Sequence, residues 1–219
     1  MSSDIQSLRE LGSAERAVHD AAYHKSSREH WGVAAPELNA WVRTLGKQRS
    51  EAEIIALTDE LWASGVMDAR VAAAKLLAVR AIGDDGAVWR RVETFKLDFD
   101  GWAIADSMKH AAERCLLADP RRLKLLDRKW TRHESFWVRR AALVFTLRWT
   151  KPGMDPTLML GWAAGYAADP EWFIQKAIGW WLRELSKHDP ARVRVFLEEH
   201  GAQMKAFARR EATRRMAGS

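Results

Sequence analysis

The sequence repeats a short helical pattern about every 34 residues. Six four-residue segments open with a small or branched apolar residue, and their first positions are Leu38, Val71, Ile104, Val138, Ile174 and Ala208. Successive first positions are 33, 33, 34, 36 and 34 residues apart. A period of this size is typical of two- or three-helix repeats that stack into a curved solenoid. We therefore predict a right-handed solenoid of about six repeats, forming a single domain over residues 1–219.

The local pattern of apolar residues indicates that the chain is all-α. Apolar residues recur at three- and four-residue spacing, as in Ile54, Leu57 and Leu61, and no run alternates in the manner of a strand. Asp-Pro steps occur at 119–120, 155–156, 169–170 and 189–190. Such a step suits a helix start, because Asp caps the first turn and Pro is tolerated at the first helical position.

Composition excludes several classes of protein. With 47% apolar and 29% charged residues the chain is globular rather than disordered. The single Cys115 cannot form an internal disulfide, and the charged N-terminal segment lacks the apolar region of a signal peptide, so we expect a cytoplasmic protein. No apolar stretch approaches the roughly 20 residues that span a bilayer. The seven histidines lack metal-ligand spacing, and no Gly-rich phosphate loop is present, so we expect neither metal nor cofactor.

Positive charge is concentrated in the middle of the chain. The net charge is +6, and residues 67–151 carry 18 basic and 11 acidic side chains, whereas residues 1–66 carry 7 and 10. This distribution favours a polyanionic partner whose phosphates the cations would contact. The alternative is a solvated helical face without a partner.

One column of the repeat carries a carboxylate among cations. The third position of the six segments reads Ala40, Ala73, Asp106, Arg140, Lys176 and Arg210. Trp102 lies four residues before the acid, and Trp180 and Arg214 lie four residues after two of the cations, so each pair shares a helix face. We predict a positively charged concave groove with indoles and one acid. The alternatives are core packing for the tryptophans and a salt bridge from Asp106 to Arg140.

Several segments together resemble a known family. They are Tyr23-His24-Lys25 with Trp31-Gly32-Val33 and Pro36, then Trp102 to Asp106, Trp137 to Ala142, and Phe173 to Glu184. In this order the chain resembles the AlkD-type DNA alkylation repair glycosylases, which are built from HEAT-like repeats. The resemblance implies excision of positively charged N3- and N7-alkylpurines from double-stranded DNA by a monomer. Ala34 departs from the family pattern, because some relatives carry a polar residue there.

The resemblance also implies roles for individual residues. Asp106, Trp102 and Trp180 would lie at the lesion nucleotide, with Arg140 on the adjacent backbone and Tyr23 close to the DNA. Other cations would position phosphates, namely Arg139, Lys176, Arg183, Arg210 and Arg214.

The chemistry is consistent with a single acid. An alkylpurine that is cationic leaves as a neutral base, so it needs no general acid, and a carboxylate can stabilise the positive charge that develops on the sugar. Two other functions compete with this glycosylase. A noncatalytic DNA-binding repeat protein would share the basic groove but would gain nothing from Asp106. A protein-interaction scaffold, a common use of helical solenoids, would not need the cations.

Overall fold

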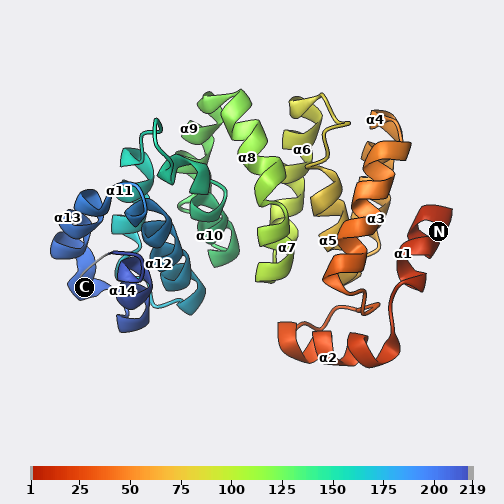
Figure 1. Cartoon of the computed structure of the whole chain (residues 1–219), viewed down its shortest axis with the longest axis horizontal. Helices are drawn as coiled ribbons and strands as arrows, with labels where there is room; N and C mark the ends of the chain where they lie inside the picture. Colours follow the sequence, from red (N-terminus) through yellow and green to blue (C-terminus); the bar gives the residue numbers. More distant parts are fainter. Residues whose placement is uncertain (1, 217–219) are drawn as a thin grey trace. The chain divides into compact units, whose positions relative to one another are not determined.

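The computed structural model describes residues 2–216, which are folded almost entirely into helices (Figure 1). Within these residues the pairing of extended segments is limited to one antiparallel bridge between Gly12 and Val33. The all-α prediction is confirmed. The chain divides into two compact units, residues 1–119 and 120–219. The single-domain organisation and the positively charged concave face stay predictions.

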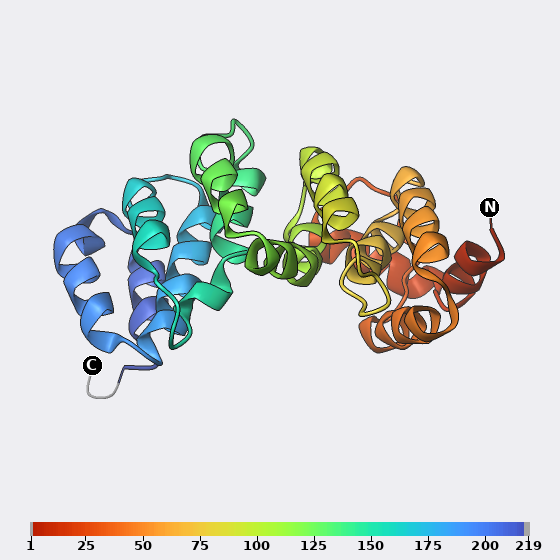
Figure 2. The same ribbon diagram turned by 90° about the horizontal axis from the view of Figure 1, so that it is seen from above.

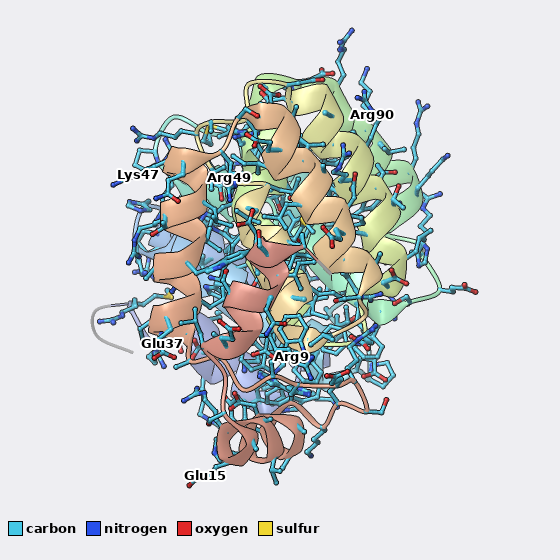
Figure 3. All side chains as sticks on the ribbon, turned by 90° about the vertical axis from the view of Figure 1, so that its right-hand side faces the viewer. Arg9, Glu15, Glu37, Lys47, Arg49 and Arg90 are labelled. Carbon is cyan, nitrogen blue, oxygen red and sulfur yellow. The ribbon has the colours of Figure 1, made fainter. Side chains whose placement is uncertain are left out.

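The first unit contains eight α-helices and one short 3-10 helix within its described residues. They are α1 (Ser3–Glu10), α2 (Ala14–His24), α3 (Ala35–Gln48), α4 (Glu51–Ala63), α5 (Met67–Leu76), α6 (Asp85–Phe95), η1 (Lys96–Asp98), α7 (Trp102–Ser107) and α8 (Lys109–Ala118). Helix α5 packs between α3 and α7, while α4 packs on α5 and α6 packs on α8. Glu15 on α2 and Lys47 near the end of α3 point into solvent (Figure 3).

The second unit repeats this arrangement. Its elements are η2 (Pro120–Arg122), α9 (Leu123–Leu125), the π-helical turn η3 (Leu126–Trp130), α10 (Phe136–Val144), η4 (Leu147–Thr150), α11 (Thr157–Gly165), α12 (Trp172–Ser186), α13 (Pro190–His200), η5 (Gly201–Gln203) and α14 (Ala206–Thr213). Helix α12 packs between α10 and α14, and α11 packs on α13 (Figure 2).

The predicted repeat matches the observed helices. The six predicted segments fall one each on α3, α5, α7, α10, α12 and α14. Their first residues are buried, except for Val71, which is partly exposed. Equivalent helices therefore stack because each turns the same apolar position toward the core. No helix within residues 2–216 is both long and apolar enough to cross a membrane.

A buried carboxylate and a glycine hold the segment that leads from α2 to α3. The Asp68 carboxylate accepts hydrogen bonds from the backbone N–H groups of Trp31 (2.8 Å) and Val33 (2.9 Å). Gly32 between them has φ +71°, and a Cβ there would lie 2.3 Å from the backbone oxygen of Ser13. This position requires glycine because both the backbone conformation and the available space exclude a side chain. The contact fixes the start of α2 against the Trp31–Val33 segment.

Two residues of α12 set how the second unit packs. The buried Gln175 donates through Nε2 to the backbone oxygens of Ala167 (2.9 Å) and Asp169 (3.0 Å), and its Oε1 accepts from the N–H of Lys205 (2.9 Å). It therefore joins α12 to the turn after α11 and to the start of α14. A Cβ on Gly179 would lie only 2.8 Å from the backbone oxygen of Ala208, so glycine permits the close approach of α12 and α14.

The tryptophans separate into two groups. Eight of the twelve are buried, including Trp41, Trp62, Trp89, Trp149 and Trp162, so the core-packing interpretation is confirmed for them. The other four are Trp102, Trp137, Trp172 and Trp180. All four lie on α7, α10 or α12, the helices that carry the repeated segments. Their side chains are at least partly exposed, so they are available for contacts with a partner.

Candidate functional site

Helix α7 places Trp102 and Asp106 one turn apart on a pocket wall. Both side chains are partly exposed. Trp102 lines a pocket of about 350 Å³ between α2, α3, α5 and α7, and it also lines an adjoining pocket of about 450 Å³ that includes Asp106. Lys75 on α5 contributes to both pockets. The predicted pairing of an indole with a carboxylate on one helix face therefore lies beside a cavity of ligand size.

Three aromatic rings, those of Tyr23, His24 and His30, form a cluster with Trp102. The Tyr23 ring meets the indole edge-on at 5.9 Å, and the His24 ring lies 5.1 Å from it, as centroid distances. His24 in turn stacks on His30 at 5.9 Å. Tyr23 is 61% exposed, so its ring forms the solvent side of the cluster. The sequence analysis named Tyr23 and Trp102 separately, and the structure brings them into contact.

Burial lowers the pKa of one histidine in each of these two pockets. It lowers the pKa of His24, with the nearby His30 adding to the effect, and it lowers the pKa of His110, which lies in the pocket of Asp106. Burial also lowers the pKa of the Lys75 ammonium. Sequence analysis named His24 only as part of the segment that resembles the family, and it missed His30, Lys75 and His110, because a histidine or lysine carries no signal of the cavity beside it. The pocket that contains Asp106 thus places one carboxylate beside an imidazole whose pKa is lowered.

The second unit has its own pocket, which collects four of the predicted residues. It has a volume of about 440 Å³ between α12 and α14. Its lining includes Lys176, Trp180, Arg183 and Arg214, together with Trp172, Phe207 and Glu211. The Lys176 Nζ lies 4.8 Å from the centre of the Trp172 ring, a distance typical of a cation–π contact. Lys176 and Trp180 share one face of α12, as predicted.

The arginines near this pocket are not equally available to a phosphate. Arg183 pairs with both Glu184 and Glu211, and Arg214 Nη1 lies 3.3 Å from a Glu211 oxygen. These carboxylates neutralise part of the positive charge. Arg210 lies on α14 as an exposed side chain. Within residues 2–216 the Lys176 ammonium has no carboxylate partner, so it is the most available cation of the pocket lining.

Arg139 and Arg140, two neighbouring cations on α10, both make contacts within the protein. Arg139 donates to the backbone oxygens of His133 and Glu134 (both 2.9 Å) and to Asp169 (3.3 Å), so it holds the segment before α10. Arg140 is only 2% exposed, with its guanidinium carbon 5.8 Å from the centre of the Trp137 ring. The third position of the repeat is therefore buried at Arg140, whereas it is exposed at Lys176 and Arg210. The role of Arg140 beside DNA stays a prediction.

The predicted site residues are divided between the two units. The first unit contains Tyr23, Trp102 and Asp106. The second contains Arg139, Arg140, Lys176, Trp180, Arg183, Arg210 and Arg214. Each unit therefore carries a pocket lined by tryptophan. The pocket of the first unit combines Asp106 with Arg43 and Lys75, and that of the second combines Glu211 with three cations. Among residues 2–216, no cluster of three His, Cys, Asp or Glu side chains could hold a metal ion.

These features define an all-α protein of stacked helical repeats. The sequence matches the family described as DNA alkylation repair enzyme over residues 5–216. The chain belongs to this family. A comparison with curated proteins gave no match.

Two solved structures share the fold. A predicted DNA alkylation repair enzyme from Enterococcus faecalis is 22% identical, with a TM-score of 0.81, over 95% of this chain and 98% of that one. AlkD2 from Streptococcus mutans is 19% identical, with a TM-score of 0.65, over 94% of this chain and 100% of that one. At these identities the likeness shows a common fold.

Proposed function

We propose that the protein is a monofunctional DNA glycosylase that removes positively charged N3- and N7-alkylpurines from double-stranded DNA. The observation that carries the proposal is the Asp106 carboxylate beside the Trp102 indole on a pocket wall, in a chain of the DNA alkylation repair enzyme family. A protein that only bound DNA would gain nothing from a carboxylate placed toward a polyanion.

The reaction is a hydrolysis of the N-glycosidic bond. As the bond from the sugar C1′ to the purine breaks, the cationic base takes the bonding electrons and leaves neutral, while positive charge develops on the sugar. Asp106 stabilises this charge and orients the water that attacks C1′, and the water's proton passes to solvent. The Trp102 indole offers its π face to this positive charge.

The surroundings of Asp106 support dependence on the charge of the lesion itself. Burial lowers the pKa values of His24 and His110, so both imidazoles are mostly neutral at pH 7 and weakly suited to protonate a leaving base. The other proposed contacts are with the DNA backbone. Lys176, Arg183, Arg210 and Arg214 bind phosphates, Arg140 acts beside the lesion backbone, and Tyr23 contacts the DNA near Trp102.

Asp106→Asn tests the carboxylate. Incubation with DNA that contains 7-methylguanine should release free base at a single-turnover rate at least about 100-fold below wild type, the scale of losing one preorganised electrostatic group. DNA affinity should stay the same or increase, because a negative charge is removed. Asp59→Asn is a matched control, since Asp59 forms a surface pair with Arg91. If Asp106→Asn released the base at the wild-type rate, the carboxylate would have a structural role and not a catalytic one.

Substrate choice tests the leaving-group argument. Cationic 7-methylguanine and 3-methyladenine should be released, whereas hypoxanthine, uracil and an uncharged isostere of 3-methyladenine should not, even when the DNA is bound. Efficient release of a neutral base would reveal a general acid and would contradict the mechanism.

A further inference from the structure

Five aromatic rings form a continuous row across three helices of the second unit. We call them the aromatic row, and they are Phe136, Trp137, Trp172, Phe173 and Phe207. Trp137 lies 4.7 Å from Phe173, Phe173 lies 4.9 Å from Trp172, and Trp172 stacks on Phe207 at 5.4 Å, as centroid distances. Contact between neighbouring rings is therefore unbroken from α10 to α14.

The repeat itself creates this row. Each ring stands one or two residues before a buried first position of the repeat, namely Val138, Ile174 or Ala208. The rings thus lie in the first turns of α10, α12 and α14, and stacking of these helices brings the turns side by side (Figure 1). In the first unit, Trp102 holds the same place before Ile104.

The aromatic row is open to solvent, unlike the tryptophans of the core. Trp172 is 47% exposed, and the other four rings are partly exposed. A contiguous exposed patch of large apolar side chains is uncommon on a monomer and marks a contact surface. The row is therefore accessible to a partner, most of all at Trp172, rather than filling the interior.

Cations beside the row specify an anionic partner. The pocket that contains Trp172 and Phe207 has three cations and one carboxylate among its described lining residues. Lys176 stands over the Trp172 ring and has no carboxylate partner within residues 2–216. A partner that stacks on Trp172 would therefore find an ammonium within reach of a neighbouring phosphate. Alternating flat rings and phosphates are the chemistry of a single nucleic-acid strand.

We propose that the aromatic row binds unpaired bases of single-stranded DNA, with one base stacked on Trp172 in the α12–α14 pocket and its phosphate on Lys176. Every base has a π face, so this binding tolerates any sequence. Paired bases are stacked on their neighbours and cannot offer that face. The proposal goes beyond the excision reaction, since it concerns unmodified DNA and aromatic rings to which that reaction assigns no role.

Fluorescence anisotropy with the full chain tests the proposal. The probes are a labelled oligothymidylate and an unmodified duplex of equal length. Trp172→Ala should weaken binding of the single strand about tenfold, the scale of losing one stacked base, and change duplex affinity less than about twofold. Trp172→Phe keeps an aromatic ring and should restore most of the affinity. Leu158→Ala, at an exposed apolar residue of α11, is the matched control.

The cation has its own test. Lys176→Ala should lower the slope of log affinity against log salt by about 0.7 on the single strand, the value for one lost phosphate contact. Arg194→Ala, an exposed cation on α13, should leave the slope unchanged. Circular dichroism checks that each variant folds, and Phe207→Ala provides a second ring variant.

Three results would overturn the proposal. They are unchanged single-strand affinity in folded Trp172→Ala and Phe207→Ala, equal losses on single strand and duplex, and binding to anionic vesicles without binding to the oligothymidylate. Because the probes contain no lesion, failure here leaves base release untouched. Asp106→Asn should keep wild-type single-strand binding, and so the two proposals fail separately.

Discussion

Gln175 offers a quantitative test of how the second unit is held together. Gln175→Leu keeps the side-chain size but removes three short hydrogen bonds, to the backbone oxygens of Ala167 and Asp169 and from the N–H of Lys205. At about 1 kcal/mol for each bond, with a further cost of about 1 kcal/mol or more for buried groups left unpaired, the free energy of unfolding should fall by about 3–5 kcal/mol. This is a large part of the roughly 5–15 kcal/mol that stabilises a typical domain.

Urea unfolding followed by circular dichroism measures this loss for Gln175→Leu. Gln203→Leu is the matched control, because Gln203 is exposed and the same substitution there should cost less than about 0.5 kcal/mol. Hydrogen exchange adds a local readout, since the Lys205 amide should lose protection in Gln175→Leu. A loss below about 1 kcal/mol, or equal losses in the two variants, would refute the reasoning.

Three further predictions concern the first unit. Gly32→Ala should destabilise the protein by at least about 1–3 kcal/mol in urea unfolding, because φ is +71° and Ser13 leaves no room for a Cβ; a smaller cost would contradict this account. Folding lowers the pKa of His24, so the free energy of unfolding should fall as the pH drops below about 6.5. His24→Gln should flatten this pH dependence, and an unchanged pH profile would show that His24 does not cause it. Trp102→Ala should slow base release about tenfold more than it weakens DNA binding, because the indole stabilises positive charge mainly in the transition state. Equal losses in rate and binding would mean that the indole only contacts the DNA.

The repeat could be predicted because its signal is simple. Positions such as Ile104, Val138 and Ile174 recur near every 34 residues and are completely buried, so one apolar spacing records both the helix and its stacking. The three- and four-residue spacing of apolar residues predicted the helices in the same direct way. The division into two compact units carries no such signal, because the apolar spacing from Ile104 to Val138 is similar to that elsewhere in the chain.

The candidate site could be predicted only where two residues share one helix. Trp102 with Asp106, and Lys176 with Trp180, follow from four-residue spacing, and the structure places each pair on a pocket wall. Arg140 shows the limit of that reasoning. Arg140 occupies the predicted third position of the repeat, yet its side chain is buried. Exposure depends on packing between helices, which the spacing of residues in the sequence does not reveal.

Contacts between distant segments explain the rest. His24 contacts Trp102, with His30 stacked on His24, because the Asp68 carboxylate and Gly32 fix the segment between α2 and α3. Trp102 is 78 residues from His24 and Asp68 is 36 residues from Gly32, and nothing in the local pattern joins them. Such three-dimensional contacts decide which polar residues face a cavity.

The missing side chain of Gly179 has a consequence for how this family could diversify. Gly179 faces the Ala208 backbone at the contact of α12 with α14, while the next residue, Trp180, faces the pocket between the same helices. The distance between those helices, and hence the width of the pocket, is therefore determined inside the protein by a residue that no ligand touches. A mutation at this hidden position could change which molecules enter without altering a single residue of the pocket wall.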